Sequence, residues 1–229
     1  MNSIQLLRLL QLADPALPIG GFAHSWGLET YVQRGKIRDA AAVSAYIEAV
    51  LRHSIRYTDA ALVSLCWEAA RSADLSALLH WDELCTAVKL PRELREGSVK
   101  LGSRLSRLLG EWTQDPLPRR FEAEVRSGSA SGHYPVWFGL YASVLGLPKE
   151  ETLTGFYFNA ASGMITNAVK LVPLGQGEGQ RVLFGLQALL ESLVAQSLDP
   201  DPECIGLCCP GFDIRSMQHE RLYSRLYMS

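Results

Sequence analysis

The stretch LTGFYFNAASGMITNAVKLVP, residues 153–173, decides the fold that we expect for this chain. Its apolar side chains recur at helical spacing: Leu153, Phe156, Tyr157, Ala160, Met164 and Leu171. Because residues three and four apart share one face of an α-helix, this spacing predicts a single long amphipathic helix. Pro173 ends it, since proline cannot continue a helix. Gly155 and Gly163 each cost the helix about 1 kcal/mol relative to alanine, which close approach of another helix would offset.

The same spacing predicts helices on both sides of this stretch, within 43–51, 62–69, 81–88, 94–108, 137–144 and 183–194. No segment alternates polar and apolar residues over the length of a strand, and no β–α–β rhythm is present. We therefore expect an all-α fold, a single helical-bundle domain of roughly eight to ten helices.

Three segments interrupt the helical pattern. The first is DPALPIGG at 14–21, a Pro/Gly turn, and the second is SGSASG at 127–132, a flexible connector. The third is DPDPE at 199–203, where alternate prolines forbid a helix. The sequence therefore predicts a helical domain over 1–198 and a C-terminal tail over 199–229, outside the core.

Composition excludes several classes of protein. With 48% hydrophobic and 20% charged residues, the 229-residue chain is globular rather than disordered. A net charge of -2 gives no support for a nucleic-acid partner. No run of about 18 apolar residues could span a membrane. Since the first residues lack the features of a signal peptide, we expect a cytoplasmic protein with free thiols.

The motifs of common enzymes are missing. Gly20 and Gly21 precede Phe22 rather than the Lys-Ser/Thr pair of a phosphate-binding loop. No G-x-S-x-G or H-E-x-x-H motif occurs. Ser, His and Asp are present without the spacing of a catalytic set, so we expect neither enzymatic activity nor a cofactor.

The cysteines give a weak metal signal. In CIGLCC at 204–209, Cys204 and Cys208 are spaced as one half of a zinc site. A second pair is missing, because Cys66 and Cys85 fall on apolar helical faces. Buried or tail thiols are one interpretation, and weak, transient metal contact by the cluster is the other. We predict no tight metal site, and interpret His24 and His133 as packing or loop residues.

One predicted helix carries a basic face, formed by Arg92, Arg95, Lys100, Arg104 and Arg107. A solvated surface explains such a face without any partner. Docking of an acidic partner surface is the alternative.

Three strings together resemble the UreF-type urease accessory proteins. They are LADPALPIGGFAHSWGLE at 12–29, NAVKLVPLGQ at 167–176 and FDIRSMQHERLYSRLYMS at 212–229. The departures are small: His24 stands where tyrosine is also common in that family, and Tyr227 replaces the usual phenylalanine. The match spans both ends and a late-middle stretch of the chain.

The resemblance implies properties that composition does not show. The family is all-α, tends to dimerise, and bridges the accessory protein UreD, also called UreH, to the GTPase UreG. The assembled complex binds apo-urease, and GTP hydrolysis by UreG accompanies nickel insertion. A generic helical adaptor unrelated to urease, or an enzyme with an unrecognised helical site, are the alternatives.

The resemblance and the residue types together suggest partner-binding positions. In the first string they are Pro18, Gly20, Gly21 and Phe22, a rigid loop facing a partner or an ordinary turn. Lys170 either stabilises a helix C-terminus or communicates with the GTPase, as the family motif implies.

The tail supplies the remaining partner-binding positions: Met217, His219, Glu220, Leu222, Tyr223, Arg225, Leu226 and Tyr227. Arg and Tyr are common in the most important contacts of interfaces. Arg225 is the sharpest candidate, because it matches a near-invariant arginine of the family motif. A tail folded back on its own domain is the alternative.

Overall fold

The long helix expected from 153–173 lies at the centre of the fold. We describe a computed structural model, which covers residues 1–21, 25–207, 209–223 and 225–227. Here α9 spans Lys149–Leu171 and begins after Pro148. Glu150 and Glu151 lie in its first turn and Lys170 in its last, the charges that suit the helix dipole. Gly155 contacts α1 closely, since a Cβ there would lie 2.7 Å from Leu9 Cδ1.

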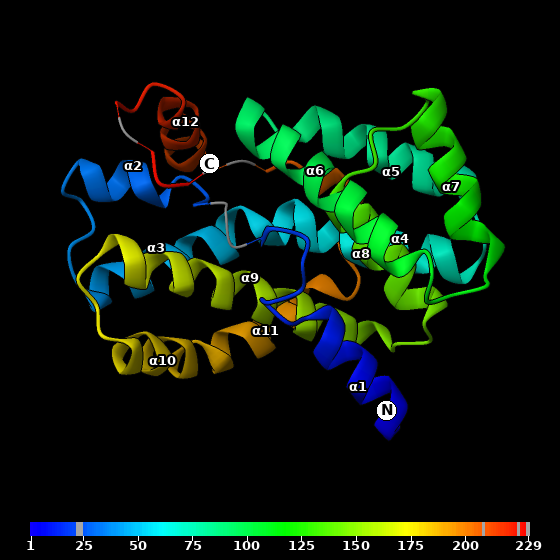
Figure 1. The fold of residues 1–229 in the computed structure, drawn as a ribbon, viewed down its shortest axis with the longest axis horizontal. Coiled ribbons are helices and arrows are strands. Elements are labelled where there is room, and N and C mark those ends of the chain that lie inside the picture. Colours follow the sequence, from blue (N-terminus) through cyan, green and yellow to red (C-terminus); the bar gives the residue numbers. More distant parts are fainter. Residues whose placement is uncertain (22–24, 208, 224, 228–229) are drawn as a thin grey trace.

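The remaining elements confirm the all-α prediction, and the described residues contain no strand (Figure 1). They are α1 (Ser3–Leu12), α2 (Leu28–Gln33), α3 (Ala40–His53), α4 (Asp59–Arg71), α5 (Leu75–Val88), α6 (Arg92–Leu109), α7 (Pro116–Ser127), α8 (Tyr134–Val144), α10 (Gln176–Gly185), α11 (Gln187–Ser197) and α12 (Pro210–His219), with short 3-10 turns at Ile55–Tyr57 and Pro202–Cys204.

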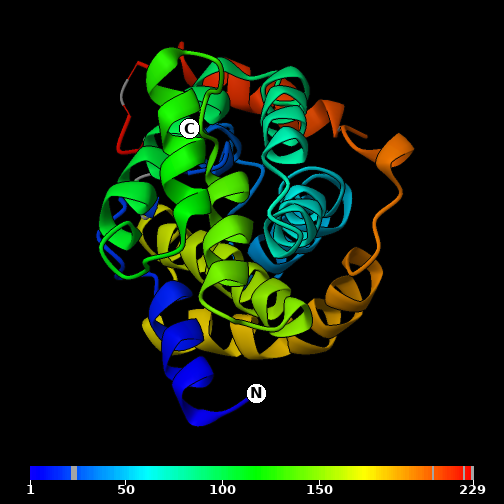
Figure 2. The same cartoon turned by 90° about the vertical axis from the view of Figure 1, so that its right-hand side faces the viewer.

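The core centres on the crossing of α4 and α8. Gly139 allows this close approach, because a Cβ on it would lie 2.5 Å from the carbonyl oxygen of Val63. Trp137 stacks on Tyr141 and meets Phe121 edge-on. Figure 2 shows the cyan segment nearly end-on, with green and yellow helices on one side and the orange segment on the other.

Two of the predicted breaks are confirmed as breaks, and the third is more ordered than expected. Residues 14–21 form turns, and α11 ends at Ser197 just before the prolines of 199–203. The predicted flexible connector at 127–132 is instead fixed at its end. The Asp82 carboxylate accepts hydrogen bonds from the backbone N–H groups of Ser131, Gly132 and His133, at 2.6 to 3.1 Å.

The C-terminal segment packs on the domain rather than lying outside the core. Its helix, α12, contacts α2 and α6 (Figure 1). The prolines at 200 and 202 stop α11, but Pro210 occupies the first turn of a new helix, where proline is tolerated. Phe212, Ser216 and His219 then fall on one face and are buried. Of the two alternatives for the tail, folding back on its own domain describes α12. The domain boundary at residue 199 and binding of a partner by the tail stay predictions.

Candidate functional site

The N-terminal and C-terminal motif segments meet where α2 packs on α12. Gly27 just before α2 has a φ of +78°, and a Cβ on it would lie 2.8 Å from Ser216 Oγ. Thr30 Oγ1 donates a hydrogen bond to the carbonyl of Arg215 at 3.0 Å. Tyr31 donates likewise to Gly211 at 3.1 Å. Only glycine readily adopts this backbone conformation and leaves room for so close a neighbour, which explains the glycine of the W-G-L-E string.

A set of charged groups, buried at one end and exposed at the other, joins α2, α6 and the C-terminal segment. We call Glu29, Glu93, His219 and Arg225 the C-terminal latch. His219 Nδ1 lies 2.8 Å from Glu93 Oε2, and His219 Nε2 lies 3.2 Å from Glu29 Oε2. The side chains of His219 and Glu29 are 0% and 1% exposed. Burying such groups is tolerated only when they are paired and hydrogen-bonded, as here.

The latch also holds the last described residues of the chain. Glu29 accepts hydrogen bonds from the backbone N–H groups of Leu226, at 2.9 Å, and Tyr227, at 3.2 Å. Arg225 Nη1 donates to Glu93 Oε1 at 2.9 Å, and its side chain remains 45% exposed. Alongside, Arg92 Nη2 pairs with Glu220 Oε2 at 2.8 Å. The arginine expected to bind a partner therefore has a partner within its own chain.

The other predicted tail residues divide into exposed and covered groups. Met217, Tyr223 and Leu226 are exposed, whereas Leu222 and Tyr227 are half-buried. Ile214, which the sequence reasoning did not select, is exposed on the same helix as Met217. Glu29 and Glu93 were missed too. Glu29 lies within the N-terminal motif, so its buried carboxylate could have been sought there.

The predicted loop is anchored on α6 as well. Gly20 has a φ of +83°, and a Cβ on it would collide with Arg104 Nη1, which donates to the carbonyl of Ile19 at 3.1 Å. Pro18 is exposed, Gly21 half-buried, and Phe22 lies outside the described residues. Glu93 and Arg104 are about 16 Å apart along the helix axis. Helix α6 thus receives both predicted partner-binding regions, while exposed Lys170 lies on α9.

The basic face of α6 is partly consumed by these contacts. Arg92 and Arg104 act as described above, and Arg95 Nη1 donates to the carbonyls of Lys89 and Leu90 at 2.8 and 3.2 Å. Lys100 and Arg107 are exposed. Several arginines that a helical wheel assigns to solvent therefore bind the protein's own backbone and its terminal segment.

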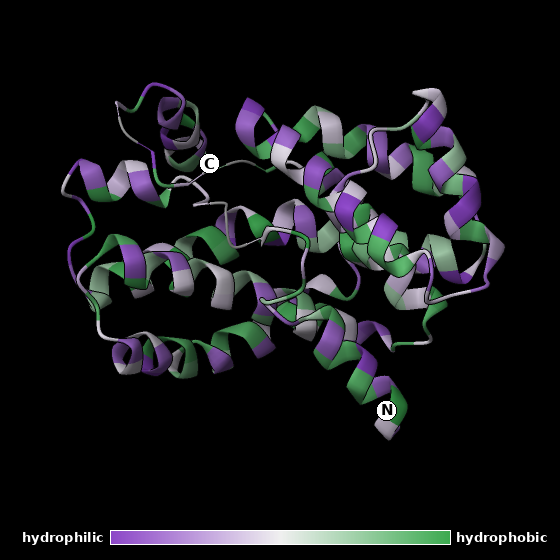
Figure 3. Cartoon of the chain, viewed as in Figure 1, coloured by the Kyte–Doolittle hydropathy of each residue, from purple (hydrophilic) through white to green (hydrophobic). Residues whose placement is uncertain are grey.

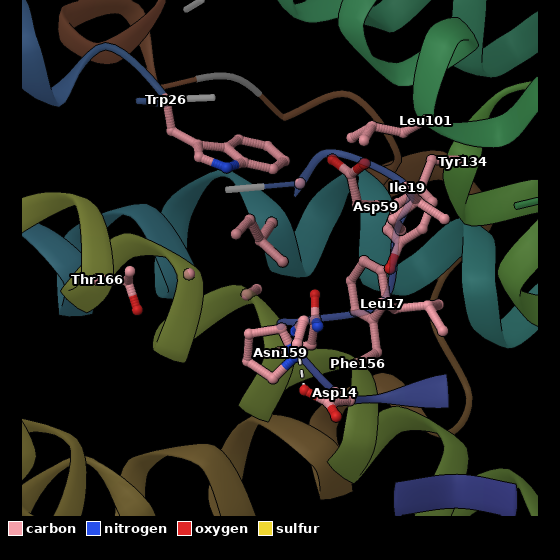
Figure 4. A pocket seen from close by; sticks show the side chains of 16 residues that line it. Asp14, Leu17, Ile19, Trp26, Asp59, Leu101, Tyr134, Phe156, Asn159 and Thr166 are labelled. Atoms are coloured by element: carbon pink, nitrogen blue, oxygen red, sulfur yellow. Dashed lines mark hydrogen bonds between the residues drawn. The ribbon is translucent and has the colours of Figure 1, made fainter. Parts of the chain in front are cut away.

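A cavity of about 320 Å³ lies under the loop, bounded by α4, α6, α8 and α9 (Figure 4). Its lining is largely apolar, with Leu17, Trp26 and Phe156 among its walls. Two of its polar side chains, Asp59 and Asn159, already have partners. Both oxygens of Asp59 lie 2.8 Å from the buried Lys89 Nζ, and Asn159 Nδ2 donates to the carbonyl of Ala13 at 3.0 Å.

Among the described residues, no three His, Cys, Asp or Glu side chains converge on a possible metal site; Cys208 and His24 lie outside that part of the chain. Cys66 and Cys85 are fully buried, as predicted, and burial raises the pKa of both thiols. His133 is buried too, which lowers its pKa to about 4, and its Nε2 lies 2.9 Å from Thr86 Oγ1.

No helix in the described ranges is both long enough and apolar enough to cross a bilayer.

Comparison with known proteins gives a consistent result. The UreF family model matches residues 37–187. The chain is 47% identical over 225 residues to "Urease accessory protein UreF" of Actinobacillus pleuropneumoniae serotype 3 (strain JL03), covering 98% of this chain and 99% of the relative. The same name belongs to relatives from Haemophilus influenzae (strain PittEE), 43% identical over 96% of this chain and 94% of the relative, and Arthrobacter sp. (strain FB24), 38% identical over 97% and 96%.

Proposed function

Because this chain belongs to the UreF family of urease accessory proteins, we propose that it is a non-enzymatic scaffold for nickel insertion into apo-urease. The observation that carries the proposal is similarity over nearly the whole chain to proteins named "Urease accessory protein UreF". The lack of a phosphate-loop motif is compatible with a scaffold whose GTPase is a separate protein. We propose the cytoplasm as its compartment, in keeping with the free thiols of Cys66 and Cys85.

The exposed side of the C-terminal segment is our proposed surface for UreD/UreH. Ile214, Met217, Tyr223 and Leu226 are large, exposed and close together in sequence. The latch fixes this segment on one side, so that its other side is presented as an ordered surface. An apolar surface of this kind suits a protein partner, and aromatic anchors contribute strongly to such contacts.

We propose that the GTPase UreG binds the loop at residues 18–21 and contacts Lys170. The loop is anchored on α6 through Arg104, so a partner would meet a preorganised backbone. Lys170 is exposed and solvated. We expect Lys170→Ala to reduce urease activation while the melting temperature changes little. Unchanged activation would leave Lys170 only its contribution to the helix dipole, a few tenths of a kcal/mol.

The homodimer that the family suggests would use α1. Leu9 and Leu12 of this helix are buried against its own domain. Four other apolar side chains of the helix are exposed: Ile4, Leu6, Leu7 and Leu10. Figure 3 shows hydrophobic residues, in green, alternating with hydrophilic ones along α1. An apolar helix face extending from the body fits a self-complementary contact between two copies. Leu7→Glu should yield a monomer in light scattering, whereas a wild-type monomer would contradict the assignment.

Reconstitution tests the scaffold proposal. We expect this chain, UreD/UreH and UreG to co-elute in size-exclusion chromatography at micromolar concentrations. Arg225→Ala should remain folded by circular dichroism and lose UreD/UreH, at least about thirtyfold in affinity if about 2 kcal/mol is lost. Arg126→Ala is the matched control, because Arg126 is also exposed and ion-paired, with Glu122 on α7. Separate elution of the wild-type proteins would refute the scaffold proposal. Capture of UreD/UreH by Arg225→Ala equal to that by the control would refute the role of Arg225.

A further inference from the structure

The cavity under the loop at residues 14–21 contains two hydrogen-bonding groups that the protein itself does not use. Tyr134 is 7% exposed, and Figure 4 shows its hydroxyl pointing into the cavity beside Phe156. Asn159 uses its Nδ2 to bond the carbonyl of Ala13. Among the described residues, neither the Tyr134 hydroxyl nor Asn159 Oδ1 has a hydrogen-bond partner. Since buried polar groups are normally hydrogen-bonded, both are available to a group that enters the cavity.

The walls of the cavity suit a neutral aromatic ring. Trp26, Tyr134 and Phe156 line it, and the charge of Asp59 is balanced by Lys89 at 2.8 Å. Burial raises the pKa of Tyr134, so that its hydroxyl stays protonated and can donate. The volume of about 320 Å³ exceeds the roughly 150 Å³ that is enough to bind benzene in another protein. An aromatic group that carries a hydroxyl therefore matches the cavity in size, charge and hydrogen bonding.

Helix α9 leaves room for such a ring at Gly163, which also lines the cavity. Glycine inside a helix is unfavourable relative to alanine. At Gly155 the close contact with Leu9 requires it, whereas a Cβ on Gly163 would meet no described atom within 4 Å. Close approach of a bound group to the backbone is a physical reason for glycine at this position.

The mouth of the cavity lies between the two features that we propose for UreG. The exposed members of its lining are Asp14 and Ala16 in the loop and Thr166 on α9. Lys170 follows Thr166 by four residues, so both share one face of the helix. A partner that contacts the loop and Lys170 together would therefore cover the mouth.

We infer that the cavity receives one tyrosine side chain of the partner that binds the loop and Lys170, an inference that rests on the proposed function. The ring packs among the aromatic walls, while its hydroxyl accepts from Tyr134 and donates to Asn159 Oδ1. Buried aromatic anchors of this kind account for much of the affinity of protein interfaces. The cavity is then the central contact of the GTPase interface.

Binding of p-cresol, the tyrosine side chain as a free molecule, tests the cavity without any partner. In the isolated ¹⁵N-labelled chain we expect p-cresol to shift the amide signals of Ala160 and Thr166, with a dissociation constant of about 1 mM or below. Gly163→Leu fills the cavity and should abolish these shifts. Gly185→Leu is the matched control, because a Cβ on this helical glycine also meets nothing within 4 Å and Gly185 does not line the cavity. Absence of p-cresol binding, or equal binding in the two variants, overturns the inference.

Tyr134→Phe separates the hydrogen bond from the fit of the ring. The variant should weaken p-cresol binding about fivefold and leave the binding of toluene, which lacks the hydroxyl, unchanged. Undiminished p-cresol affinity in Tyr134→Phe would contradict the assigned hydrogen bond.

Capture of UreG identifies the source of the ring. In the reconstituted complex, Gly163→Leu should lose at least about thirtyfold in affinity for UreG and keep UreD/UreH, while Gly185→Leu behaves as the wild type. Equal capture of UreG by the two variants overturns the inference even where p-cresol binds. A wild-type chain that captures no UreG refutes the proposed function instead, and this failure is distinguishable because p-cresol binding needs no partner.

Discussion

The crossing of α4 and α8 and the C-terminal latch both bring distant segments into close contact, but by different means. The crossing is made by shape: Gly139 has no side chain, so that the backbone of α4 at Val63 and Trp67 approaches it closely. The latch is made by charge: a histidine, an arginine and two glutamates satisfy one another. Apolar contact depends little on salt and pH, whereas buried ionic contact depends on protonation. The core should thus unfold globally, and the latch should open alone.

The largest expected effect tests the role of shape. Gly139→Ala should destabilise the protein by more than about 3 kcal/mol, at the upper end for overpacking, because its Cβ would meet backbone atoms of Val63 and Trp67 that cannot easily move. Gly163→Ala is the control, since a Cβ there meets nothing within 4 Å; it should add about 1 kcal/mol. Denaturant unfolding measures both. Equal effects would show that the crossing does not depend on close approach.

Acid should weaken the core through His133. Burial lowers the pKa of His133 in the folded state to about 4, against about 6.5 in the unfolded chain. Between these values the unfolded state binds the proton and the folded state does not. Stability should therefore fall by about 3 kcal/mol as pH drops from about 6.5 to about 4. Unfolding curves at several pH values measure the free energy of unfolding, and His133→Gln should make it less dependent on pH. If the variant keeps the wild-type dependence on pH, other groups are responsible for it.

A smaller effect is expected where α2 meets α12. Thr30→Val removes the hydrogen bond to the carbonyl of Arg215 and leaves that carbonyl without this donor. Docking of α12 should weaken by about 1 kcal/mol. Amide hydrogen exchange within α12 should accelerate accordingly, while exchange in α4 and α8 stays the same. Equal acceleration in all three helices would mean that α12 unfolds only with the core.

The smallest effect concerns Arg225. Its ion pair with Glu93 is half exposed, and exposed ion pairs contribute about 0 to 1 kcal/mol. Arg225→Ala should therefore leave the global free energy of unfolding within about 1 kcal/mol of wild type, although it disrupts partner capture. Thermal unfolding measures the first quantity. A larger loss would make the latch part of the cooperative core and remove the contrast between the two regions.

Much of the fold follows from local pattern. The spacing around Phe156 and Tyr157 predicts α9, and that within 43–51 predicts α3. Apolar periodicity identifies such helices because it reports which face is buried. The burial of Cys66 and Cys85 follows for the same reason. Proline was over-interpreted at 199–203: it ends α11, but carries no information on whether the chain packs again afterwards.

The latch could not be read from local pattern. Its contacts join residues 126 to 198 apart, and Glu29 has no sequence neighbour that explains its burial. One signal was present in the tail. Phe212, Ser216 and His219 fall on one helical face, which predicts packing of that face even though serine and histidine are polar. The first and third motif strings contain Glu29, His219 and Arg225, but nothing in the strings shows that the two segments contact each other.

The long sequence separation of the latch has a consequence for biosynthesis. Residues 225–227 are made after every group that they contact, and contacts between distant residues form late because closing a long loop costs entropy. The helices of the core can assemble while this segment is still being synthesised. A chain interrupted before Arg225 would still contain the whole α4–α8 crossing, but would lack the ordered terminal surface. The latch therefore distinguishes a chain that has been synthesised past Tyr227 from one terminated before Arg225, and any partner that requires the latch would not bind the shorter chain.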